Sequence, residues 1–166
     1  MTDPRPTAPD TAQITAWLNA RLAGFDAHMG LRFVDAGPNR VVARVELGPQ
    51  HRQPFGLVHG GLYAAVIEAI CSTGGGVAVF ARGRTVVGLD NHTSFHRAAR
   101  PGVITATATP VKVGRRTHLW RAEILDSADR LVATGQVRLM VVDPKADLGR
   151  ELPPGELAPG PDTDPQ

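Results

Sequence analysis

The chain has 166 residues, of which 42% are hydrophobic and 20% charged, and its net charge at pH 7 is +2. This length and apolar content suit a single domain with one buried core. The single cysteine excludes an internal disulfide and is ordinary for a reducing compartment, and the first ten residues, with three prolines and two acids, do not read as a secretory signal. We therefore expect a cytoplasmic protein.

The N-terminal part of the chain predicts a short helix and a hairpin. Residues 1–10 are expected to be a flexible lead. Apolar residues at helical spacing predict a covering helix over Thr11 to Phe25, with Thr11 as a possible N-cap. Two strands, Leu31 to Ala36 and Arg40 to Leu47, follow around a Gly-Pro-Asn turn.

The central prediction is one long helix over Gly61 to Phe80, whose two faces differ in side-chain size. At about 100° per residue, the large apolar residues share one face: Leu62, Tyr63, Val66, Ile67, Ile70 and Val77. Small residues surround Glu68 on the other face: Gly61, Ala64, Ala65, Cys71, Ser72 and Gly75. This pattern indicates that a second backbone or a slender ligand approaches Glu68, and an ordinary amphipathic helix is the alternative.

Four strands are expected after the helix, in a meander that covers its apolar face. They span Thr85 to Arg97, Gly102 to Val113, Thr117 to Leu125 and Arg130 to Val142. The fold class is therefore α+β, with the domain at 11–142. Residues 143–166 are rich in Pro, Gly and acids and are expected to form a disordered tail. No apolar stretch runs for the about 20 residues of a membrane span without Glu68, an arginine or a glycine cluster, so no membrane contact is expected.

The start of the long helix carries a second chemical signal. Gly60 and Gly61 leave backbone N–H groups unobstructed at the positive end of the helix dipole. Such donors suit a developing oxyanion. Two glycines can also serve only as a tight turn, but here Gln53, His59 and an acidic helix accompany them.

The run Gln-Pro-Phe-Gly-Leu-Val-His-Gly-Gly at 53–61, followed by Glu68 and Ser72, resembles the hotdog-fold acyl-CoA thioesterases. It is most similar to the branch with a helix Glu, which includes the 4-hydroxybenzoyl-CoA thioesterase of the Arthrobacter type and YdiI, whereas the related PaaI proteins have Asp. The resemblance extends from about Met29 to Val142. It implies a long helix wrapped by an antiparallel sheet, a dimeric unit and hydrolysis of a CoA thioester.

The resemblance also implies roles for single residues. Glu68 would be the catalytic carboxylate, either as a nucleophile on the thioester carbon or as a general base for water. Gln53 and His59 would polarise and orient the carbonyl, and the Gly60 N–H would be the oxyanion donor. Ser72, one turn after Glu68, could orient the hydrolytic water. From the residues alone, a buried Glu68 paired with an arginine and a merely small Ser72 remain open.

The charge distribution fits a phosphate-bearing ligand. Residues 143–166 carry six acids and two bases, which leaves a net charge of +6 on residues 1–142. A nucleic-acid partner is not expected, because the chain is only 5% aromatic and lacks zinc-site spacing. The phosphates of CoA are the simpler choice. The resemblance implies CoA contacts from Gly61, Arg97, Gly114, Arg115, Arg116 and Thr117, although exposed turn arginines are also common.

Helix geometry predicts that two chains share each site. His59 and Glu68 are nine residues apart, about 180° around and about 13 Å along a continuous helix. Two antiparallel helices across a two-fold axis would bring each Glu68 to the partner's Gly60 end. We expect a homodimer with shared active sites that assembles to a homotetramer.

The sequence thus predicts an acyl-CoA thioesterase for an aromatic or medium-chain acyl group. A hotdog acyl-thioester dehydratase is an alternative, but its motif spacing looks different. A non-catalytic acyl-CoA-binding hotdog protein is another, but residues 1–30 are short and Pro-rich for a DNA-binding segment. Cys71 is interpreted as packing, and His92 and His96 do not make a convincing metal site, so no metal or other cofactor is expected.

Overall fold

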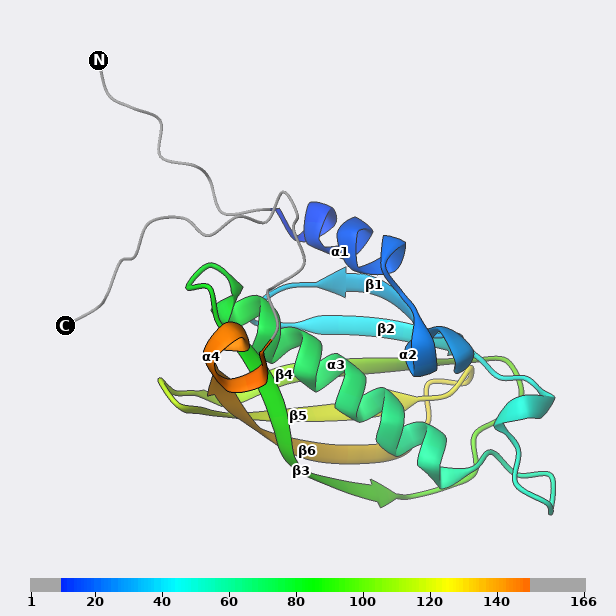
Figure 1. Cartoon of the computed structure of the whole chain (residues 1–166). Coiled ribbons are helices and arrows are strands. Elements are labelled where there is room, and N and C mark those ends of the chain that lie inside the picture. Colours follow the sequence, from blue (N-terminus) through cyan, green and yellow to red (C-terminus); the bar gives the residue numbers. More distant parts are fainter. Residues whose placement is uncertain (1–9, 150–166) are drawn as a thin grey trace.

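The computed structural model of the chain describes residues 10–149. In this part of the chain, six strands form one antiparallel sheet that curves around one long helix (Figure 1). The strands are β1 (Arg32–Ala36), β2 (Val41–Glu46), β3 (Thr85–Phe95), β4 (Val103–Val113), β5 (Thr117–Leu125) and β6 (Leu131–Val142). A helix wrapped by an antiparallel sheet is the arrangement that the resemblance implied.

The long helix, α3 (Gly60–Phe80), contacts all six strands and provides the centre of the core. Its large apolar face is buried as predicted except at the half-buried Val77, and Cys71 and Gly75 are buried with it rather than left on the small-residue face. The reason is close packing from the sheet. A Cβ on Gly74 would lie 2.4 Å from the Trp120 ring, and one on Gly75 would lie 2.4 Å from a Leu139 methyl group. The glycines of α3 therefore admit large side chains of β5 and β6.

The sequence prediction that no stretch is apolar enough to span a membrane is wrong for α3. Its 21 residues contain an 18-residue window with a mean hydropathy of 1.5, which meets the length and composition of a span, and it is the one such helix among residues 10–149. Half of that apolar window is buried inside the fold. Because the helix packs against every strand of the sheet, its apolar character is accounted for by the protein core.

The order of the strands differs from the predicted four-strand meander. The sheet runs β1-β2-β4-β5-β6-β3, so of the four strands after α3 only β4, β5 and β6 follow one another as neighbours. β3 leaves the end of α3 and pairs with β6 at the far edge, while β2 pairs with β4. Strand patterns report which face of a strand is buried, not which strand lies beside it, so the sequence could not give this order. The consequence is that β3 is an edge strand.

Two terminal elements also differ from the predictions. The expected helix from Thr11 to Phe25 is split into α1 (Thr11–Ala20) and α2 (Gly24–His28), because Gly24 adopts a positive φ of 58°. The N-cap of α1 is Asp10 rather than Thr11. The start of the expected disordered tail forms a short helix, α4 (Pro144–Leu148), which Asp143 caps. The remainder of that tail and most of the expected N-terminal lead lie outside the described residues.

Candidate active site

The loop before α3 presents the Gln53 amide as a hydrogen-bond donor. The loop is closed by backbone hydrogen bonds, from Gln53 N–H to the Leu57 carbonyl and from Gly56 N–H to the Gln53 carbonyl. Gly56 turns the chain with a φ of 84°. The Gln53 side-chain oxygen accepts from the Phe55 N–H, so its amide orientation is set and its NH₂ group is left to donate.

His59 and Gly60 form the start of α3. His59 is the N-cap, and its Nδ1 accepts from the Gly61 N–H at 2.8 Å. In the neutral ring the proton therefore sits on Nε2, which can donate from this exposed side chain. Within residues 10–149, no acceptor is hydrogen-bonded to the Gly60 N–H. The N–H of Gly61, a residue expected to contact CoA, donates to His59 Nδ1.

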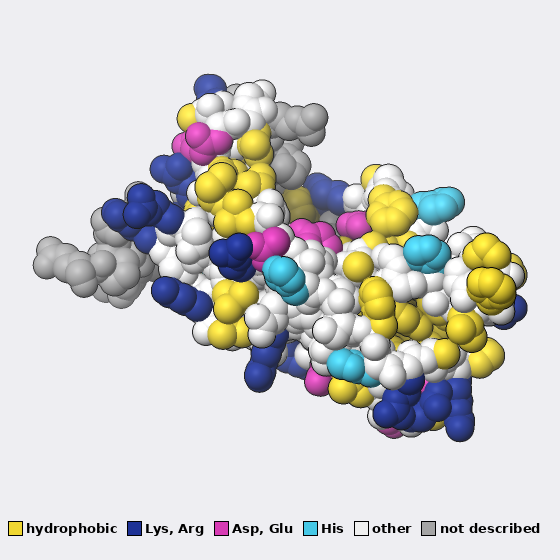
Figure 2. Space-filling model, turned by 90° about the horizontal axis from the view of Figure 1, so that it is seen from below, with side chains coloured by type: hydrophobic (Ala, Val, Ile, Leu, Met, Phe, Trp, Pro, Cys, Tyr) yellow, Lys and Arg dark blue, Asp and Glu magenta, His cyan; other side chains and the backbone are white. Residues whose placement is uncertain are grey.

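Exposed apolar side chains surround this end of α3. Phe55, Leu57 and Phe95 are 91%, 52% and 57% exposed, respectively. Figure 2 shows hydrophobic side chains gathered at the end of the molecule where the loop before α3 lies. The Phe95 ring stands over Gly60, since a Cβ on Gly60 would lie 2.9 Å from it, and it packs against Tyr63 at 6.2 Å between ring centroids. Apolar groups thus flank the free donors.

Glu68 lies half-buried in the middle of α3 and accepts a hydrogen bond at each carboxylate oxygen. Ser72 Oγ donates to Oε1 at 3.1 Å, and the Asn91 amide on β3 donates to Oε2 at 3.0 Å. The same amide donates to the Ala64 carbonyl at 3.0 Å, and Thr93 Oγ1 donates to Asn91 Oδ1 at 2.7 Å. The carboxylate is therefore held from both α3 and β3, with Ser72 bonded to it directly.

Sequence reasoning missed four residues of β3 that line this region. Asn91 donates to the carboxylate, Thr93 donates to Asn91, Phe95 covers Gly60, and Gly88 leaves room for Glu68. A Cβ on Gly88 would lie 2.7 Å from Glu68 Oε1. The available signal was the alternation of the strand, which places Asn91, Thr93 and Phe95 on the side opposite His92.

One chain does not bring all the predicted groups together. Glu68 follows Gly60 by eight residues on one continuous helix, about 12 Å along its axis. The donors from Gln53, His59 and Gly60 are at the start of α3, and the carboxylate with Ser72 is at its middle. A thioester carbonyl bound at the helix start would therefore be out of reach of the same chain's Glu68.

The predicted CoA contacts are also divided. Arg97 follows β3, at the end of the sheet where α3 begins, whereas the turn from Gly114 to Thr117 joins β4 to β5 at the other end (Figure 1). The eleven residues of β3 separate these ends by roughly 35 Å. Arg97, Arg115 and Arg116 are all exposed. Gly114 is required by the turn, because a Cβ there would lie 2.8 Å from the Thr117 carbonyl oxygen.

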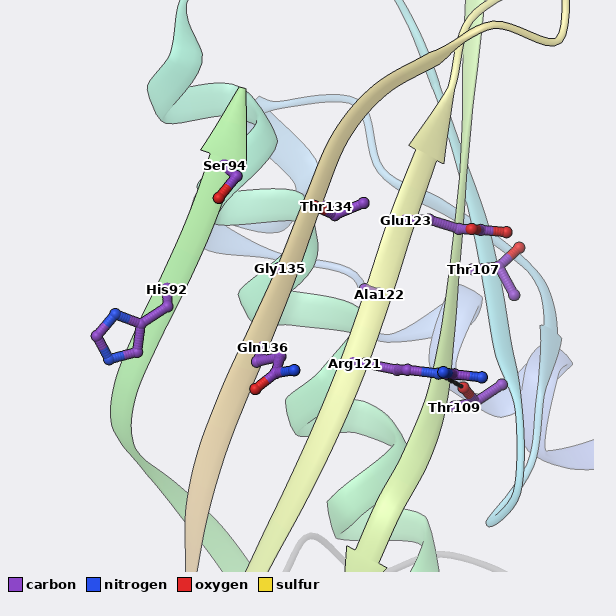
Figure 3. A pocket seen from close by; sticks show the side chains of 10 residues that line it. All are labelled: His92, Ser94, Thr107, Thr109, Arg121, Ala122, Glu123, Thr134, Gly135 and Gln136. Atoms are coloured by element: carbon purple, nitrogen blue, oxygen red, sulfur yellow. Dashed lines mark hydrogen bonds between the residues drawn. The ribbon is translucent and has the colours of Figure 1, made fainter. Parts of the chain in front are cut away.

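A separate hollow of about 610 Å³ lies on the outer face of the sheet, away from α3 (Figure 3). It is open and polar, and its lining comes from β3, β4, β5 and β6: His92, Ser94, Thr107, Thr109, Arg121, Ala122, Glu123, Thr134, Gly135 and Gln136. Glu68 and Gly60 lie on the helix side of the sheet, so this hollow is separate from both residues. It does show that His92 and Ser94 point away from Glu68 (Figure 3).

Cys71 is buried, as expected for a packing residue. Burial, and then the charge of Glu68, raise the pKa of its thiol to about 12, so it does not supply a nucleophilic thiolate at neutral pH. Among the described residues, no three His, Cys, Asp or Glu side chains are grouped to hold a metal ion. The chemical groups of the site are therefore one held carboxylate and several free donors.

Comparison with known proteins places the chain among thioesterases. Residues 55–133 match the family model described as the thioesterase superfamily. The Mycobacterium tuberculosis protein Rv1847 is 39% identical over 142 residues, 82% of this chain and 94% of that protein, and its solved structure has a TM-score of 0.70. The proofreading thioesterase EntH of Cronobacter turicensis is 31% identical over 75% of this chain and 91% of its own.

A solved Haemophilus influenzae thioesterase is 28% identical, with a TM-score of 0.72 over 83% of this chain and 94% of its own. These matches and the helix wrapped by a six-stranded sheet define a hotdog-fold protein, as the sequence predicted. The chain belongs to the thioesterase superfamily. The family and the relatives support a hydrolase that acts on thioesters.

Proposed function

We propose that this protein is an acyl-CoA thioesterase of the helix-Glu branch, acting on an aromatic or medium-chain acyl group without a metal or other cofactor. The observation that carries the proposal is Glu68, a half-buried carboxylate with a donor on each oxygen, in a helix whose start offers donors without a partner within the described part of the chain. The exposed Phe55 and Phe95 side chains beside these donors suit an apolar acyl group. The EntH relative, itself a thioesterase, supports the same reaction type.

In the proposed reaction, the Gly60 N–H and the Gln53 amide bind the thioester oxygen, where negative charge develops. Glu68 either removes a proton from water as the water oxygen attacks the carbonyl carbon, or attacks that carbon itself and is released by water from the resulting anhydride. The carbon–sulfur bond breaks, and the CoA thiolate takes up a proton. In both routes one water is consumed, and the products are a carboxylate, CoA thiol and one proton.

The proposed active unit is a homodimer, with a homotetramer as its further assembly. β3 is an edge strand beside Glu68, and a second copy placed antiparallel across a two-fold axis would bring its Gly60 end to this carboxylate. The same two-fold would bring the partner's turn 114–117 toward Arg97. Each CoA would then contact phosphate-binding arginines from both chains, in a cytoplasmic enzyme.

The direct test is CoA release from a panel of aroyl-, medium-chain, long-chain and short-chain acyl-CoAs, followed with a chromogenic thiol reagent. We expect hydrolysis of at least one aroyl- or medium-chain substrate. Glu68→Gln keeps the size of the side chain and should lower kcat by about 10²-fold to 10⁴-fold. Ser94→Ala, on the outer face of β3, is the matched control. Absence of hydrolysis across the panel, or wild-type turnover by Glu68→Gln, would overturn the proposal.

A further inference from the structure

The half-buried Glu68 has a hydrogen-bond partner outside its own helix, and no part of the proposed function assigns that partner a role. This partner is Asn91, in the middle of β3. We propose that Asn91 is a positioning residue that fixes the orientation of the Glu68 carboxylate, and that Thr93 in turn fixes the Asn91 amide. The inference rests on the proposed function of Glu68, and deepens it.

The hydrogen bonds of Asn91 leave it little freedom. Its NH₂ group donates to Glu68 Oε2 and to the Ala64 carbonyl, both at 3.0 Å, so both of its donor hydrogens are in use. Its oxygen accepts from Thr93 Oγ1 at 2.7 Å. If the amide were flipped, an oxygen would face the carboxylate and the Ala64 carbonyl, and the NH₂ group would face the Thr93 hydroxyl. The network therefore selects one amide orientation.

The carboxylate gains a fixed plane from this arrangement. Ser72 is on the same helix as Glu68, so its hydrogen bond to Oε1 does not fix the carboxylate relative to the sheet. Asn91 ties the other oxygen to the sheet. Gly88, also on β3, leaves space for Oε1, since a Cβ there would lie 2.7 Å away. β3 thus both restrains the carboxylate and makes room for it.

The neighbouring residues of β3 provide internal controls. His92 and Ser94 line the hollow on the outer face, so they point away from Glu68 while sharing the same strand (Figure 3). Substitutions there disturb β3 without touching the carboxylate. Thr93→Val removes only the hydroxyl that orients Asn91, and Thr93→Ser keeps it.

The kinetic test compares kcat and KM for Asn91→Leu, Thr93→Val, Thr93→Ser and Ser94→Ala on one acyl-CoA. Asn91→Leu should lower kcat by about 10-fold to 100-fold with little change in KM, because a misplaced reacting group affects the chemical step. Thr93→Val should show a smaller loss that Thr93→Ser restores, and Ser94→Ala should match the wild type.

Wild-type kcat in folded Asn91→Leu would overturn the inference, and so would a loss of kcat in Thr93→Val that Thr93→Ser does not restore, which indicates a structural role. Should Asn91→Leu fail to fold, the pair Thr93→Val and Thr93→Ser decides in the same way. If Glu68→Gln is inactive while these variants keep full activity, only this inference fails and the proposed function stands.

A second measurement does not depend on turnover. In the folded protein, the side-chain NH₂ signals of Asn91 in a ¹⁵N NMR spectrum should shift on Glu68→Gln and stay unchanged on Ser94→Ala. Unchanged Asn91 signals in Glu68→Gln would mean that the hydrogen bond is not formed in solution, which overturns the inference even if no acyl-CoA is cleaved.

Discussion

The start of α3 and its middle both carry groups suited to thioester chemistry, but the fold holds them differently. At the start, Gln53 and His59 each use one side-chain atom locally and leave a donor facing outward. In the middle, Glu68 is half-buried and hydrogen-bonded at both oxygens. A single chain therefore fixes the Glu68 carboxylate through its own hydrogen bonds. The donors at the start of α3 lie instead in an open region beside exposed apolar side chains, and a second molecule would have to cover this region to enclose it.

The largest expected effect tests whether the two regions work across two chains. Gln53→Ala and Glu68→Ala should each be nearly inactive alone, yet unfolding and refolding them together should restore activity. About half of the dimers would be mixed, and each would carry one site with both lesions and one with none, so recovery should approach roughly a quarter of wild type.

Each variant refolded by itself is the control for this experiment. If mixed dimers verified by mass spectrometry remain inactive, the two regions do not meet across a dimer. A site within one chain, with the loop folded back over its own helix, would then be the better explanation.

A smaller effect should sharpen the comparison at the two ends of the sheet. Arg97→Ala, or Arg115→Ala with Arg116→Ala, should raise KM for acyl-CoA by roughly 3-fold to 10-fold, the effect of a charge contact of about 1 kcal/mol. kcat should change little, because phosphate contacts are equal in the ground and transition states. Arg40→Ala, an arginine paired with Asp35, is the matched control. An unchanged KM at low salt would show that these arginines do not bind CoA.

The smallest effect concerns stability in the packed region. His118 is buried under α3, and burial, followed by the charge of Arg82, lowers the pKa of its imidazole. The unfolded chain therefore takes up a proton at higher pH than the folded chain does. Above about pH 6.5, the ordinary pKa of histidine, the residue adds no pH dependence, and below it the free energy of unfolding should fall with pH.

His118→Leu is the variant that tests this source of acid sensitivity. Urea unfolding between pH 8 and pH 5 should show a smaller loss of stability for His118→Leu than for the wild type. Because neither buried ring nitrogen of His118 has a hydrogen-bond partner among residues 10–149, the variant should be at least as stable at pH 8. Parallel pH curves for the two proteins would assign the acid sensitivity to other groups, of which the buried His51 is the first candidate.

The sequence predicted what depends on local pattern. The long helix, the strands and the packing role of Cys71 follow from periodicity and composition, and the structure has them within a few residues. The helix break before Gly24 was missed because apolar spacing continues through Leu22, and only the backbone conformation of that glycine ends the element. Local sequence patterns thus predict which helices and strands form better than they predict the residues at which those helices and strands end.

The candidate site was predictable only where it is contiguous. Gln53, His59, Gly60 and Glu68 lie within one motif, so a resemblance could identify them together. Asn91 reaches Glu68 only because β3 crosses to the far edge of the sheet and pairs with β6. Strand order arises from three-dimensional packing, which a single sequence does not encode in its alternation, and so the partner of the carboxylate could not be named.

Cys71 is an intrinsic probe of the rate at which the protein core opens. It is the one cysteine in the sequence, and it lies on the buried face of the helix that all six strands contact. A thiol reagent can modify it only when α3 separates from the sheet, so the modification rate of the unaltered protein measures how often the core opens. No label or engineered residue is needed. A bound ligand that bridges two chains should lower the rate at which the reagent modifies Cys71.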